Sequence, residues 1–165
     1  IMSNVNLVEQ FSPLIRVDFE LKNSFRLLTE IKKDRALSMS FDNNLLTEVS
    51  GNEYTIGLGY RIKDVIINSK LADNPTGVIK SDINIKTDFS LRKNNTIVRY
   101  LDYDNNELAG GQNLWSIKLS ADYSFSKNLT AIFFYDHQFS KAVISTSFPI
   151  TNVRTGFTIR YNFGN

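Results

Sequence analysis

The chain has 165 residues, of which 19 are basic and 17 acidic, so its net charge is only +2. This length fits one domain, and the even spread of charge leaves no basic patch for nucleic acid. The absence of cysteine excludes a disulfide framework and thiol chemistry. No apolar stretch approaches the roughly 18 residues that a membrane helix needs, which excludes a helical membrane protein.

Apolar and polar residues alternate along much of the chain. In the first such stretch, 15–22, every odd-numbered residue is apolar and every even-numbered residue is charged. The stretches 54–62, 82–92, 115–125 and 155–163 repeat the alternation, and none of them carries a charge on its apolar side. A period of two is typical of a β-strand with one apolar and one polar face.

In chain order, the pattern predicts nine strands, at 13–22, 25–32, 36–50, 53–63, 80–92, 96–103, 113–126, 128–138 and 151–163. Short turns are expected at 23–24, 51–52, 93–95 and 126–128, because Asn and Gly tolerate the positive φ of tight hairpins. Longer loops are expected at 64–79, 104–112 and 139–150, and 33–35 is a short exception. Short turns at one end and long loops at the other are typical of outer-membrane barrels, whose short turns are periplasmic.

A soluble β-sandwich or small barrel would also alternate, since its apolar face forms a core. Two features favour a membrane instead. The predicted strands are longer than the roughly five or six residues usual in soluble sheets. The apolar-side aromatic residues also lie towards strand ends, and a stretch such as 115–125 would cover about 33 Å, or roughly 25 Å of membrane height when tilted by about 40°. The residues expected to form this lipid-facing aromatic girdle are Tyr54, Tyr60, Trp115, Tyr123 and Phe125.

The chain closes on an alternating strand in which Tyr161 and Phe163 lie on the apolar side. This ending resembles the C-terminal signal by which the outer-membrane insertion machinery selects its clients. We therefore predict an antiparallel transmembrane β-barrel segment in the outer membrane of a Gram-negative bacterium, with its polar face lining a passage. The lumen-lining residues are expected to be Arg16, Asp18, Glu20, Lys86, Asp88, Arg92, Lys118, Asp122, Arg154 and Arg160.

No arrangement of residues points to catalysis or metal binding. His137, the only histidine, is expected at the margin of a long loop without partners at ligand spacing. Gly57 and Gly59 precede no helix, so they are expected to leave room for a bulky neighbour on a strand and not to cradle a phosphate. Gly110 and Gly111 are expected at a loop tip. We therefore expect a protein that is not an enzyme and needs no cofactor.

Several segments resemble one family: 80–92 with 94–99, 116–123 with 126–129, 134–136, 145–149 and the closing strand. They resemble the C-terminal end of the SprA/Sov proteins, the giant outer-membrane translocon barrels of the type 9 secretion system in Bacteroidota. The resemblance covers most of the chain and is clearest from Glu53 onward. It implies a very large barrel through which folded cargo with a C-terminal secretion signal leaves the periplasm, and the export of surface adhesins in gliding bacteria. The partners it implies are the remainder of the translocon barrel, a PorV-type shuttle barrel, a periplasmic plug protein, the cargo proteins and outer-membrane lipid.

The predicted strand count indicates part of a barrel. Nine is odd, whereas a complete bacterial barrel has an even number of strands. Two unpaired sheet edges in lipid would also leave backbone groups without hydrogen bonds. The opening, Ile1-Met2-Ser3-Asn4, lacks the basic and apolar regions of a signal peptide. We therefore expect 1–165 to be the C-terminal wall segment of a longer protein, processed or excised. Two alternatives stay open: a free-standing small outer-membrane barrel of structural or adhesive type, and a soluble β-sheet domain that binds a ligand.

Overall fold

The computed structural model describes residues 3–22, 24–68, 77–103, 105–126, 128–144 and 148–163. Within these ranges the chain forms seven β-strands and no helix, so no helical segment there could cross a membrane. The strands are β1 (Asn4–Leu21), β2 (Phe25–Ser40), β3 (Leu45–Asn68), β4 (Val78–Tyr100), β5 (Asn105–Ser124), β6 (Leu129–Ala142) and β7 (Ile150–Tyr161).

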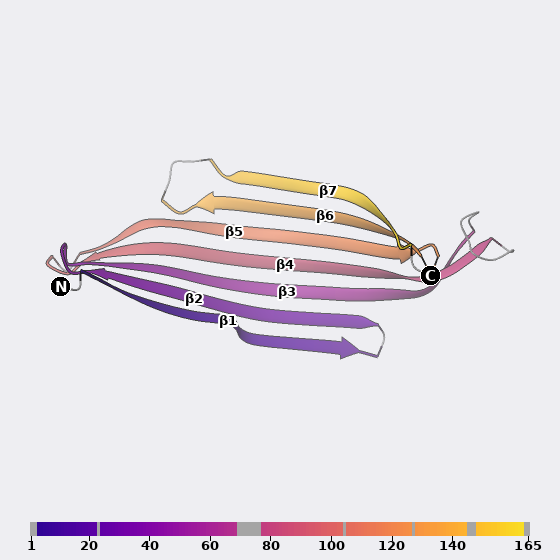
Figure 1. The fold of residues 1–165 in the computed structure, drawn as a ribbon, viewed down its shortest axis with the longest axis horizontal. Coiled ribbons are helices and arrows are strands. Elements are labelled where there is room, and N and C mark those ends of the chain that lie inside the picture. Colours follow the sequence, from indigo (N-terminus) through magenta and orange to yellow (C-terminus); the bar gives the residue numbers. More distant parts are fainter. Residues whose placement is uncertain are drawn as a thin grey trace.

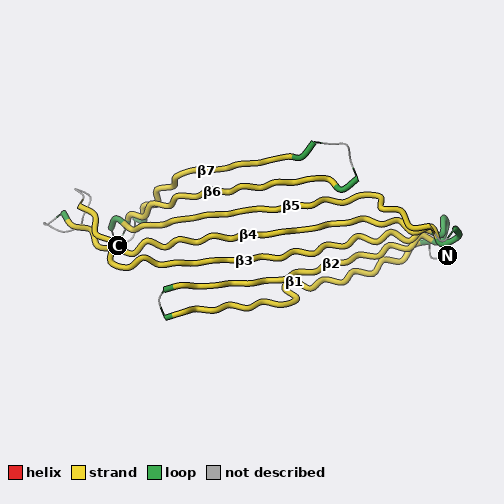
Figure 2. The backbone as a smooth tube through the Cα atoms, turned by 180° about the vertical axis from the view of Figure 1, so that it is seen from behind, coloured by secondary structure: helices red, strands yellow, loops and turns green. Residues whose placement is uncertain are grey.

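All seven strands belong to one antiparallel sheet, in which each strand pairs with its neighbours in the chain. Figure 1 shows them side by side in a single layer, with β1 at one edge and β7 at the other. Figure 2 shows the same layer from behind, and none of the described segments covers either face. The two edge strands share no ladder within the described residues, so the sheet is open. The expected all-β antiparallel architecture is confirmed, as an open sheet of seven strands.

The strands are fewer and longer than predicted. β3 and β4 contain 24 and 23 residues, which corresponds to about 80 Å each at about 3.4 Å per residue. The predicted turns at 33–35, 51–52 and 93–95 are wrong, because these residues lie inside β2, β3 and β4. Clusters of polar residues and glycine favour turns locally, but here each cluster is paired on both sides within the sheet.

The predicted loops are also too long. β3 and β4 both extend into the predicted loop 64–79, of which 69–76 lies outside the described residues. The predicted loop 104–112 is wrong apart from its first residue, which is not described, because β5 already begins at Asn105. The predicted loop 139–150 begins inside β6, and its residues 145–147 are likewise not described.

One hairpin falls where an uninterrupted strand was predicted. Phe41, Asp42, Asn43 and Asn44 form the turn between β2 and β3, and Asn44 has a φ of 48°. Asn adopts this left-handed conformation more readily than most residues. The Asn44 carbonyl accepts a hydrogen bond from the Leu101 amide at 3.1 Å, and its side chain donates to Asp102 at 3.0 Å. These bonds join this turn to the one between β4 and β5.

Short turns and long loops are mixed at each end of the sheet, whereas the prediction placed the short turns at one end and the long loops at the other. The β1–β2 turn, the β5–β6 turn and the end of β7 all lie at one end (Figure 1). The longest connection, between β3 and β4, leaves and re-enters the sheet at this same end. The other end carries the short β2–β3 and β4–β5 turns together with the longer β6–β7 connection.

The sheet has almost no interior of its own. The buried apolar side chains are Ile79, Tyr123 and Ala131, and no described side chain falls below 2% exposure. A soluble domain of this size packs a second layer onto its apolar face. Here hydrogen bonds between neighbouring strands hold the structure together. No described segment packs on the apolar face.

Candidate functional site: the two faces of the sheet

Residues directly opposite each other in a β ladder point to the same side of the sheet, so the register defines two faces. One row runs across all seven strands from Ile15 through Tyr54 and Trp115 to Thr151. This row and the parallel rows as far as the one that contains Ile62 form what we call the apolar band. None of these rows contains Asp, Glu, Lys or Arg. On the three central strands the band consists of five residues each: Tyr54, Ile56, Leu58, Tyr60 and Ile62 on β3; Leu91, Phe89, Thr87, Ile85 and Ile83 on β4; and Trp115, Ile117, Leu119, Ala121 and Tyr123 on β5.

The apolar band is a large exposed surface. Tyr54 is 53% exposed, Phe157 is 62% exposed and Ile159 is 65% exposed. Strand spacing and rise give the band a width of about 30 Å and a length of about 27 Å along the strands, or about 800 Å². Monomeric soluble proteins rarely expose contiguous apolar patches beyond a few hundred Å². The band therefore requires an apolar environment outside the described chain.

The apolar band ends abruptly at one margin. Beyond the row of Tyr54 and Trp115, the next row on the same face reads Lys33, Asn52, Lys93, Asn113 and Lys141 on five neighbouring strands. We call it the lysine row. Each of the three wrongly predicted turns contributes one residue to this row. These residues, Lys33, Asn52 and Lys93, lie side by side on neighbouring strands. Their polar residues mark the level at which the apolar face stops, and the chain continues through it as strand.

Past the lysine row, both faces of the sheet carry charge. On the side of the apolar band, Glu48 accepts hydrogen bonds from Arg99 at 2.6 Å and from Arg35 at 2.8 Å. These bonds, that from Arg99 foremost, lower the pKa of the Glu48 carboxyl, which lies outside the apolar band. The sheet thus has one apolar and one polar face only along the part of the strands that forms the apolar band.

The opposite surface is the polar face. The register brings all ten residues predicted to line a lumen to this one side of the sheet, between or beside the rows of the apolar band. Three of them, Lys86, Lys118 and Arg160, make no ion pair within the described part of the chain. Others are paired across strands: Asp18 with Arg26 at 2.5 Å, and Asp136 with Arg154 at 2.5 Å.

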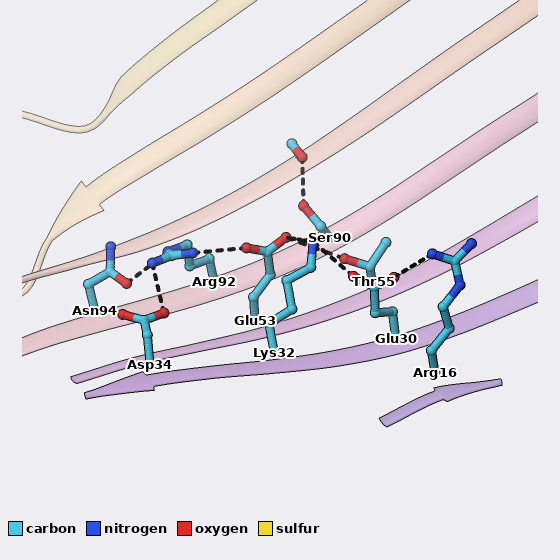
Figure 3. Close-up of polar contacts among 10 residues, drawn as sticks. Arg16, Glu30, Lys32, Asp34, Glu53, Thr55, Ser90, Arg92 and Asn94 are labelled. Atoms are coloured by element: carbon cyan, nitrogen blue, oxygen red, sulfur yellow. Dashed lines mark hydrogen bonds and ion pairs between the residues drawn. The ribbon is translucent and has the colours of Figure 1, made fainter. Parts of the chain in front are cut away.

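A chain of ion pairs crosses four strands on the polar face. Glu30 contacts Arg16 at 3.4 Å and Lys32 at 2.9 Å, and Lys32 lies 3.8 Å from Glu53. Arg92 then contacts Glu53 at 3.0 Å and Asp34 at 3.1 Å. Figure 3 shows this succession of side chains from Arg16 on β1 to Arg92 on β4. The sheet therefore carries an ordered electrostatic strip on the same side as the predicted lumen residues.

Sequence analysis identified only two members of this chain, Arg16 and Arg92. Lys32, Asp34 and Glu53 lie next to or inside the clusters that were read as turns, and Glu30 lies two residues before Lys32 in a predicted strand. The signal was nonetheless present, because Glu30, Lys32 and Asp34 continue a period of two straight through the predicted turn at 33–35.

Replacing Arg92 by alanine is expected to lower the free energy of unfolding by about 1 kcal/mol, since the partly exposed guanidinium serves two carboxylates. Urea titration of the protein measures this loss. Lys118→Ala on the same face, which removes no ion pair among the described residues, is the control and should change stability little. Equal losses in the two variants would show that the ion pairs of Arg92 contribute nothing.

Glycines on the polar face admit larger side chains from neighbouring strands, as predicted for Gly57. A Cβ on Gly57 would lie 2.7 Å from an Asp88 carboxylate oxygen and 3.2 Å from Cβ of Leu28. A Cβ on Gly156 would lie 2.6 Å from the ring of Phe134. The predicted loop tip at Gly110 and Gly111 is wrong, because both residues lie inside β5.

The predicted girdle aromatics lie on the side of the apolar band, but they are not equivalent. Tyr54 and Trp115 stand in the row next to the lysine row. Tyr123 is only 8% exposed, and its hydroxyl donates to the Val65 carbonyl at 3.2 Å. Its ring meets Phe125 edge-on, with centroids 5.1 Å apart. Tyr123 therefore packs against the sheet, whereas Tyr54 projects from it.

His137 lies in β6 within the apolar band and not at a loop margin, so its predicted position is wrong. Its ring stacks on Trp115 at a centroid distance of 4.9 Å, and Nδ1 lies 3.0 Å from the Tyr135 hydroxyl. Among the described residues, no group of three or more His, Cys, Asp or Glu side chains could hold a metal ion. These contacts give His137 a packing role.

The C-terminal aromatic pair is close together. Tyr161 lies opposite Leu129 on the side of the apolar band, and its ring meets Phe163 edge-on at 4.7 Å. Arg160, next to Tyr161, lies on the polar face.

No family model and no curated protein matches this chain. The two faces of the sheet are therefore the observations from which a function can be argued.

Proposed function

We propose that this chain is a wall segment of a large outer-membrane β-barrel, with the apolar band against lipid and the polar face towards a water-filled passage. One observation carries the proposal: a single-layer sheet with an exposed band free of Asp, Glu, Lys and Arg on one side and charges on the other side of the same stretch. A bilayer provides the apolar environment that no described part of the chain provides. The length of the band along the strands, about 27 Å, projects to roughly 21 Å of membrane height at a tilt of about 40°, close to the roughly 25 Å apolar height of such barrels.

The open edges support membership of a larger structure. In hydrocarbon every unpaired backbone group costs several kcal/mol, so spanning sheets close on themselves. β1 and β7 each present one unpaired edge among the described residues. We propose that strands from elsewhere in the same protein pair with these edges.

We further propose that the passage conducts protein, as in the SprA/Sov translocons of the type 9 secretion system that the sequence resembles. The polar face suits this role, because its charges are of both signs and many are already neutralised by neighbours. Such a wall binds a passing polypeptide weakly. In this proposal the chain works with the rest of the barrel, a PorV-type shuttle, a periplasmic plug and cargo bearing C-terminal signals.

Single cysteines can test the two faces, because the chain has none of its own. In the full-length protein with any other cysteines replaced, Asp88→Cys and Lys118→Cys should react with a water-soluble maleimide in intact outer membranes. Phe89→Cys and Leu119→Cys, one residue further along the same strands, should not. Equal labelling of the two pairs would remove the proposal of a membrane wall.

A cross-linking arm tests protein conduction. A maleimide–benzophenone reagent attached at Lys118→Cys should, on illumination, trap a secreted protein in transit, and the same reagent at Leu119→Cys should not. Correct labelling of the faces without any trapped cargo would contradict a translocon and favour a free-standing barrel of structural or adhesive type.

A further inference from the structure

Three unpaired cations line one margin of the apolar band. Lys33, Lys93 and Lys141 are exposed, lie in the same ladder row and face the same side as Trp115. Within the described part of the chain none of them makes an ion pair. They sit on alternate strands, so their Cα atoms are about 10 Å apart, twice the strand spacing.

The shape of this cationic line limits what can bind it. The lysine row is a single residue high and runs parallel to the edge of the apolar band. The next arginines outward, Arg35 and Arg99, both pair with the single carboxylate of Glu48 and so are less available to a partner than the lysines. A globular acidic partner would fit a broad patch, whereas a layer of anionic headgroups fits a line at the rim of an apolar surface.

The opposite margin of the apolar band has no such line. There the row beyond Ile62 and Ile83 contains Val65, Ser81, Leu129 and Tyr161 and no lysine or arginine among the described residues. On the face of the apolar band, a row of lysines is thus found at the margin away from the C-terminal end of β7.

We propose that the lysine row binds the phosphate groups of anionic lipids in the leaflet away from the C-terminal end of the sheet. The inference rests on the proposed membrane position of the chain and adds a lipid class and a leaflet to it. The aliphatic stem of each lysine lies along the apolar band while its ammonium group reaches the headgroup level. Trp115 and Tyr54, in the adjoining row, occupy the interface just below.

Lipid retention by the full-length protein tests the proposal. Wild type and a Lys33→Gln/Lys93→Gln/Lys141→Gln variant are inserted into phosphatidylcholine vesicles containing phosphatidylglycerol, re-extracted in detergent, and assayed for bound lipid by mass spectrometry. The variant should retain phosphatidylglycerol more weakly, by about fivefold for each lysine removed. A Lys86→Gln/Lys118→Gln/Arg160→Gln variant, which removes three unpaired cations from the polar face, should retain it as wild type does.

Each other outcome has a distinct meaning. Equal retention by wild type and the lysine-row variant, or an equal loss in the polar-face control, would overturn the lipid site while leaving the membrane position intact. Displacement of phosphatidylglycerol by millimolar inorganic phosphate would identify a site for free phosphate instead. Failure of wild type to enter vesicles at all would overturn the proposed function itself, and the lipid site with it.

Discussion

Replacing Leu119 by lysine is expected to lower the free energy of unfolding in a bilayer by about 2–4 kcal/mol. Leu119 lies in the middle row of the apolar band, between Thr87 on β4 and Tyr135 on β6. A charge at this depth loses its hydration and has no carboxylate in its own row to replace it. Urea titration of the full-length protein in phospholipid vesicles measures the loss.

Ser116→Lys is the matched control for this charge. Ser116 lies on the same strand but on the polar face, opposite Ser90 and Gln138. A lysine there should cost well under 1 kcal/mol, apart from the lost hydroxyl contact of 2.8 Å with Ser90. If the two lysines cost the same, the face with the apolar band is not covered by an apolar medium.

Gly156→Ala is expected to cost about 1–3 kcal/mol, because its methyl group would collide with the Phe134 ring 2.6 Å away. The Arg154 guanidinium lies 5.7 Å from the centroid of this ring, so a displaced ring would also give up its cation–π contact. Gly110→Ala is the control: its new Cβ would meet nothing closer than Thr96 Cβ at 3.9 Å, so its stability should be unchanged or slightly higher.

A double-mutant cycle assigns the Gly156 effect to the Phe134 ring. In a Phe134→Ala background, Gly156→Ala should lose most of its cost, which gives a coupling energy of about 1–3 kcal/mol. Additive losses in the cycle would mean that the close packing of this ring over the glycine does not matter for stability.

The proposed bilayer position of the apolar band would account for the turn positions that the sequence misidentified. The clusters at 33–35, 51–52 and 93–95 share a composition of Lys, Asn, Asp and Gly with true turns, and the turn at 41–44 has a similar composition. A short window of sequence cannot tell a chain reversal from a strand that leaves an apolar environment. Only the partners of these residues in the neighbouring strands distinguish the two cases.

Side-chain direction is the property that the sequence determined by itself. Successive side chains of a strand alternate between faces whatever the strand pairs with, so period two assigned all ten predicted polar-face residues to one side. The same period assigned Trp115 and Tyr54 to the apolar side. The absence of a side chain at Gly57 likewise predicted the close approach of a neighbour.

Strand length, register and the contacts between strands were decided by tertiary structure. The lysine row and the ion-pair chain join residues from four or five strands, and their alignment depends on pairings between distant segments such as Lys33 with Asn52 and Glu53 with Arg92. The turn at Asn44 fixes that register, and a hairpin placed at 33–35 would have aligned different residues. Alternation is a local consequence of backbone geometry, whereas the position of each charge along the sheet follows from hydrogen bonding between strands.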